Sequence, residues 1–211
     1  MNMEEDDKLL REISQKLSLM CTKLEGTFDT TIDAFVHHNI KKLEEAEVPA
    51  NEIHKLGEEI IASLSDVSVK TKEEKEQLKG VVSAATHLQR AADAVRGMFP
   101  PVKIKVNEDL LFSDKAIGEL KYLSENTREV IKNAGDAFLT KNQFLLGHAL
   151  EKGSHLNEIA DSYALEHEER LIAGVCMPKA SPVFLNMLEC IVRLNWYTMM
   201  ALKKFFFLRE E

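Results

Sequence analysis

The chain has 211 residues, of which 45% are hydrophobic, and its 27 lysines and arginines against 35 aspartates and glutamates give a net charge of −8. This content is enough to fill the core of one large domain or two small ones. The basic residues are scattered among acids, which argues against nucleic acid as a partner, since binding it needs a concentrated basic face.

Only 5 prolines and 9 glycines interrupt the chain, so its long uninterrupted stretches favour helices. Apolar residues recur at steps of three and four over residues 9–43, which predicts one long amphipathic helix. We expect this helix to end before Pro49, because proline restricts the residue ahead of it and suits the first turn of a helix. A second, shorter helix should therefore begin at Pro49 and end near Leu64.

Thr71 and Glu74 have the spacing of a capping box, so a third helix should begin there and continue to Phe99. Two prolines follow directly and should end it. Residues 102–107 alternate apolar and basic side chains, and without a partner strand we interpret them as an extended connector.

The second half of the chain predicts three more helices. Ser113 should cap a fourth helix that ends near Leu150, at a break by Gly153. A fifth helix follows that break. Ser181, with proline after it in the first turn, is the predicted N-cap of a sixth helix that should extend to about Leu208.

The two halves repeat one frame, found at residues 88–93 and 188–193: a leucine, a polar residue, and a charged residue four positions after the polar one. Residues at i and i+4 lie on one face of a helix. A repeat of long, short and long helices predicts an all-α fold of two tandem three-helix bundles packed side by side. The expected division is a first repeat at 1–99, a connector at 100–112 and a second repeat at 113–211.

The repeated frame resembles the L-E-R-I-x-D signature of the PhoU family, in which each repeat carries an ExxxD pair of acids. Gln89 replaces the first acid of the first pair, and Arg193 replaces the second acid of the second pair. The second half, with Phe112, His167 and Arg170, looks closest to the PhoU-like domain of bacterial sodium/phosphate cotransporters.

This resemblance implies a non-enzymatic regulatory or docking module of phosphate uptake. Such a module acts by protein–protein contact, and its expected partner is a phosphate transporter, a cotransporter membrane domain or a phosphate sensor kinase. The resemblance also implies a tendency to form homodimers. A helical interaction domain unrelated to phosphate is a further reading, because a fold does not fix a function.

The alternative function is storage or sensing of iron or another divalent ion, which the family holds on its acidic pairs. Two carboxylates one helical turn apart suit a hard cation, but each frame here keeps only one. The family's other pairs fall near Glu47 with Asn51 and Glu151 with His155, and a zinc face of His148, Glu151 and His155 is a weaker option. The candidate metal ligands are Asp93, Glu151, His155 and Glu189. We expect no resident cofactor, because Arg193 would repel a cation from Glu189.

The sixth predicted helix carries two apolar stripes, although one would suffice for the core. A helix that is apolar on more than one side must be covered on more than one side. The second stripe therefore packs on the other bundle or contacts a second copy or a transporter. The candidate partner-contact residues are Leu185, Val192, Trp196, Met199 and Phe206.

Nothing in the sequence argues for catalysis, because it has no phosphate-cradling glycine loop and no nucleophile elbow. Its three cysteines are far apart and without a metal-binding spacing, which favours the reducing cytoplasm. The acidic N-terminus is unlike a signal peptide, and no stretch has the ~20 apolar residues of a membrane span. We expect a cytoplasmic protein, free-standing or part of a transporter, that reaches the inner face of the membrane through that transporter.

Overall fold

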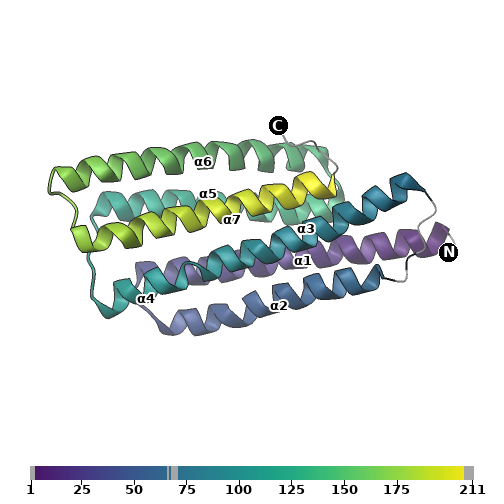
Figure 1. Cartoon of the computed structure of the whole chain (residues 1–211), viewed down its shortest axis with the longest axis horizontal. Helices are drawn as coiled ribbons and strands as arrows, with labels where there is room; N and C mark the ends of the chain where they lie inside the picture. The colour runs from purple at the N-terminus through teal and green to yellow at the C-terminus, as the bar shows by residue number, and fades with distance from the viewer. Residues whose placement is uncertain (1–2, 66, 68–70, 207–211) are drawn as a thin grey trace.

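Six long helices lie side by side along one axis and form an elongated bundle (Figure 1). The computed structural model describes residues 3–65, 67 and 71–206, and within these ranges the chain contains no strand. The long helices are α1 (Met3–Val36), α2 (Lys41–Ser63), α3 (Lys72–Arg96), α5 (Asp114–Thr140), α6 (Gln143–Ile172) and α7 (Ser181–Phe205). Two short elements join them, α4 (Phe99–Asn107) and the 3₁₀ turn η1 (Pro178–Ala180).

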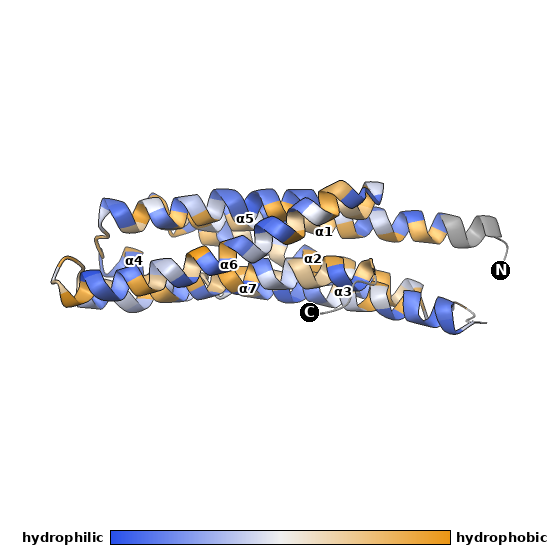
Figure 2. Ribbon diagram, turned by 90° about the horizontal axis from the view of Figure 1, so that it is seen from above, coloured by the Kyte–Doolittle hydropathy of each residue, from blue (hydrophilic) through white to orange (hydrophobic). Residues whose placement is uncertain are grey.

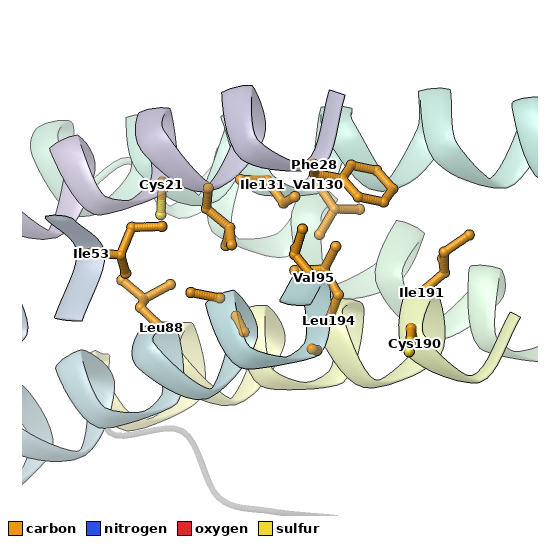
Figure 3. Packing of buried hydrophobic residues seen from close by; sticks show 14 of the residues in the cluster. Cys21, Phe28, Ile53, Leu88, Val95, Val130, Ile131, Cys190, Ile191 and Leu194 are labelled. Atoms are coloured by element: carbon orange, nitrogen blue, oxygen red, sulfur yellow. The ribbon is translucent and has the colours of Figure 1, made fainter. Parts of the chain in front are cut away.

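Two pairs of corresponding helices pack against each other across the halves. Helix α1 contacts α2 and α5, while α3 contacts α7, and α5 contacts α6 (Figures 1 and 2). The apolar faces meet in one continuous core, in which Phe28 and Val95 of the first half lie near Val130 and Leu194 of the second (Figure 3). The predicted all-α fold of two three-helix bundles packed side by side is confirmed.

Two predicted helix starts are also confirmed. The Thr71 hydroxyl accepts a hydrogen bond from the Glu74 amide at 3.1 Å, and the Thr71 amide donates to the Glu74 carboxylate at 3.2 Å. The Ser113 hydroxyl accepts from the Ala116 amide at 3.3 Å. Each side chain satisfies a backbone donor that the first turn of a helix leaves without a partner.

The predicted end of the first helix is wrong. Helix α1 ends at Val36, and Pro49 lies inside α2. The chain turns where His38 adopts a left-handed conformation with φ of 53°, and the side chain of Asn39 accepts a hydrogen bond from the Lys41 amide. The apolar spacing continues through this turn, so periodicity does not reveal it.

The boundaries in the second half differ in the same way. Helix α5 ends before Lys141, which has φ of 55°, and the Asn142 side chain caps α6. Gly153, the predicted break, lies in the middle of α6. Ser181 begins α7 but makes no capping hydrogen bond, so the predicted N-cap is wrong; the predicted end at Leu208 lies outside the described residues.

The predicted extended connector is also wrong, because residues 99–107 form helix α4. Phe99, Val102 and Lys105 are buried, and their spacing of three places them on one helical face. Pro100 and Pro101 lie in the first turn of α4, where the missing amide proton costs no helical hydrogen bond. Among the described helices, none is long and apolar enough to cross a membrane.

Candidate functional site

The acids of the first half lie on neighbouring faces of α2 and α3, where Arg96 occupies the space between them. Arg96 Nε lies 3.3 Å from a Glu47 carboxylate oxygen, and its Nη1 lies 3.5 Å from Asp93. The same guanidinium donates a hydrogen bond to the Asn51 side-chain oxygen. Asp93 also pairs with Nε2 of His54 at 2.9 Å. Both predicted acidic positions of this half thus have a cationic side chain beside them.

Gln89, which replaces an acid of the family signature, ties α3 to α2. Its amide nitrogen donates to the His54 carbonyl oxygen at 3.0 Å. A Cβ at Gly57 would lie only 2.5 Å from that nitrogen, so a larger residue there would displace the Gln89 side chain. The Gln89 side chain therefore has a structural contact in the packing of the first half.

The remaining predicted ligands belong to the second half and face water. Glu189 on α7 is exposed and lies 4.0 Å from Nη1 of Arg193. His155 on α6 lies 3.6 Å from Glu158, and Glu151 is exposed. Across the described ranges, no three His, Cys, Asp or Glu side chains gather in a group that could hold a metal ion. Whether the chain binds a metal stays a prediction.

The second apolar stripe of α7 is divided between the interior and the surface. Met199 is buried, and its sulfur lies against Gly153 of α6, where a Cβ would approach it to 2.5 Å. Trp196 is 44% exposed, with its ring centroid 5.0 Å from that of Tyr197 and 6.1 Å from that of His87 on α3. The remaining residues of the stripe are half-buried and pack against the core: Leu185, Val192 and Phe206. Trp196 is thus the most accessible residue of the predicted partner contact.

A buried polar cluster lies at the end of the bundle where α5 begins and α6 ends. Arg170 donates two hydrogen bonds to the Glu119 carboxylate, at 2.8 and 2.7 Å, and both side chains are largely buried. His167 pairs with the Ser181 hydroxyl at 2.9 Å and stacks on Phe184 at 4.6 Å between centroids. Burial, helped by the charge of Arg170, lowers the pKa of His167 and favours its neutral form.

A small cavity of about 200 Å³ opens beside this cluster. Its lining comes from the start of α5, the segment before it, the last part of α6 and the loop between α6 and α7. The lining residues are Leu111, Phe112, Ser113, Ala116, His167, Val175, Cys176, Met177 and Ala180. Of these residues, the sequence indicated Phe112 and His167 only through the family resemblance, because the cavity joins residues more than fifty positions apart in the chain.

Lys105 of α4 is the second feature that the sequence did not reveal. Its side chain is buried, with Nζ 4.8 Å from the ring centroid of Phe35 and 5.9 Å from that of Phe112. Burial lowers its pKa from 10.5 to about 8, although Asp109 opposes the shift. The cation therefore joins α1, α4 and the segment before α5 through aromatic faces.

These features define an all-α protein whose two three-helix halves pack through corresponding helices. The structure is similar to that of PhoU from Pseudomonas aeruginosa, with a TM-score of 0.84 and 11% identity over 96% of this chain and 97% of that one. It is also similar to the phosphate transport system regulatory protein PhoU from Streptococcus pneumoniae, with a TM-score of 0.82 and 13% identity over 96% of this chain and 95% of that one.

Scans of the sequence against protein-family models and against curated proteins gave no match. At these identities the likeness shows the fold, which is that of PhoU over almost the whole chain. The expected PhoU-like fold is confirmed by it, while the closer resemblance of the second half to cotransporter domains stays a prediction.

Proposed function

We propose that this protein is a PhoU-like regulator of phosphate uptake that acts in the cytoplasm by contact with other proteins and without catalysis. One observation carries the proposal. The structural similarity to each PhoU protein covers almost all of this chain and almost all of the PhoU chain, so it is not confined to one shared motif. The repeated frame at 88–93 and 188–193 supports it independently, because these segments occupy equivalent helices, α3 and α7.

The partner we propose is a phosphate transporter, a cotransporter membrane domain or a phosphate sensor kinase, approached by the protein as a monomer or a homodimer. Trp196 on α7 is the first candidate contact, since it is large, aromatic and 44% exposed, and such residues often dominate binding energy at interfaces. The proposal requires no resident metal, because the guanidinium of Arg96 already lies between Glu47 and Asp93 and offsets part of their charge.

The test compares cross-linking and capture of this protein from its own cells under phosphate-replete and phosphate-starved conditions. Wild type is set beside Trp196→Asp and beside Phe144→Asp, an equally disruptive change at a residue of α6 that is 77% exposed. We expect wild type and Phe144→Asp to recover a phosphate transporter or sensor and Trp196→Asp to lose it. Recovery of no phosphate-related protein by any of the three would refute the proposed function.

Stoichiometric iron or another transition metal in protein purified from its own cells, lost on Glu151→Ala, would instead establish the metal-binding alternative.

A further inference from the structure

One end of the bundle presents apolar side chains to the surroundings. The loop between α6 and α7 has no charged residue from position 171 to 178 and extends past the ends of both helices, where it is coloured as hydrophobic in Figure 2. Ile172, the last residue of α6, is 88% exposed, Val175 and Met177 of the loop are 65% and 48% exposed, and Leu111, from the segment before α5, is 68% exposed. We call these four residues the end patch. Grouped exposed apolar residues of this kind mark contact sites.

The loop that carries the end patch is held in place. The amides of Val175 and Cys176 both donate to the carbonyl oxygen of Arg170, at 2.9 and 3.4 Å, and the Arg170 side chain is fixed by Glu119. Gly174 supplies the left-handed turn, with φ of 71°. A loop ordered before binding loses less conformational entropy when a partner arrives.

The cavity of about 200 Å³ opens within the end patch, since Leu111, Val175 and Met177 line it. Pockets for small molecules usually start at about 300 Å³. This cavity is smaller and the residues at its mouth are apolar, so it suits one large side chain that inserts from a partner as an anchor.

The surroundings of the end patch are acidic. Exposed carboxylates stand within four residues of the end patch along the chain: Glu108, Asp109, Asp114, Glu168 and Glu169. Among the nearby bases, Lys115 is paired with Glu166, Arg170 with Glu119, and His38 lies 3.7 Å from Asp109. Lys179 is an exposed base of the loop. Such a rim attracts a basic partner and repels an anionic lipid surface.

We propose that the end patch is the docking site for a protein segment in which a large apolar side chain stands between lysines or arginines. The inference rests on the proposed function, in which the chain acts by contact with another protein, and it adds a surface distinct from Trp196. The apolar side chain fills the cavity, and the flanking cations pair with the acidic rim.

The rate at which Cys176 is alkylated can report whether the cavity is occupied. Cys176 lines the cavity and is only half-buried, whereas Cys21 and Cys190 are buried and burial raises the pKa of both thiols. Alkylation of the folded protein should therefore begin at Cys176. A segment seated in the cavity should slow that reaction, which peptide mass spectrometry can follow.

The probes are three short synthetic peptides and vesicles of phosphatidylglycerol. The first peptide has a leucine–phenylalanine centre between lysines, the second has glutamates for the lysines, and the third has serines at the centre. We expect the first peptide, at ten times its Kd, to slow Cys176 alkylation about tenfold, and the other probes to have little effect. Val175→Asp should abolish the protection, while Phe144→Asp, at the opposite end of α6, should retain it.

Absence of protection by the first peptide, equal protection by the second or third, or protection by the vesicles alone would each overturn the end patch as this docking site. A photo-cross-linking residue placed at Val175 or at Trp196 in cells separates this inference from the proposed function. A transporter or sensor captured from Val175 supports both the end patch as a docking site and the proposed function. Capture from Trp196 alone overturns the end patch and leaves the proposed function, whereas capture from neither overturns the proposed function.

Discussion

Removal of either partner from the buried pair of Glu119 and Arg170 should destabilise the protein strongly. The Glu119 side chain is 5% exposed and that of Arg170 is 13% exposed, and two hydrogen bonds of 2.8 and 2.7 Å join them. Removing one partner of such a pair costs about 3–5 kcal/mol, because the other charge stays buried without compensation. For Arg170→Met, Lys115 at 3.9 Å from Glu119 should offset about 1 kcal/mol, so we expect a loss of about 2–4 kcal/mol.

The double variant Glu119→Leu with Arg170→Met should be much closer to wild type than the sum of the single changes, since no buried charge remains. We expect a coupling energy of about 2–3 kcal/mol in a double-mutant cycle, measured by urea unfolding followed by circular dichroism. Glu129 and Lys152 form the matched control, because they join the same two helices at the surface and should couple by less than about 1 kcal/mol. Additive effects at Glu119 and Arg170 would refute the reasoning.

Three further predictions concern stability. Lys105→Met should remove a pH dependence of the free energy of unfolding. The folded-state pKa of Lys105, about 8, lies below the ordinary 10.5, so between these values the unfolded chain binds more protons than the folded one. As the pH rises from 7 to 9.5, wild type should therefore gain about 1–2 kcal/mol of stability relative to the variant, and a constant difference would contradict the burial of the amine. Thr71→Ala should cost about 1 kcal/mol and Thr71→Ser much less, as measured by urea unfolding, because only alanine removes the cap of α3; equal costs would argue against the cap. Phe138→Ala should cost about 3–5 kcal/mol in the same assay, because the ring is fully buried and packs edge-on against Phe205 at 5.1 Å; a loss below about 1 kcal/mol would show a core that collapses around the gap.

Helix starts and apolar faces could be predicted because their determinants are local. Thr71 and Ser113 each bond to an amide three residues away, and the spacing of apolar residues follows directly from 3.6 residues per turn. Together with the repeated frame, these signals were enough for an all-α fold of two three-helix bundles.

Helix ends were less predictable, because the apolar pattern continues through the turns. His38 and Lys141 adopt left-handed backbone conformations that cannot be predicted from their residue types, because they depend on how the helices pack. Ser181 looks like a cap in the sequence, yet its hydroxyl is paired with His167, fourteen positions away.

The sequence by itself determined that the chain forms long helices, which face of each helix is apolar and which positions carry the repeated frame, since all of these depend on neighbours within a turn or two. Only the tertiary structure decided which charges meet. Arg96 reaches Asn51 across 45 positions and Arg170 reaches Glu119 across 51, and such pairs depend on how helices pack. The same packing brings residues 111–113 and 175–177 together around one cavity.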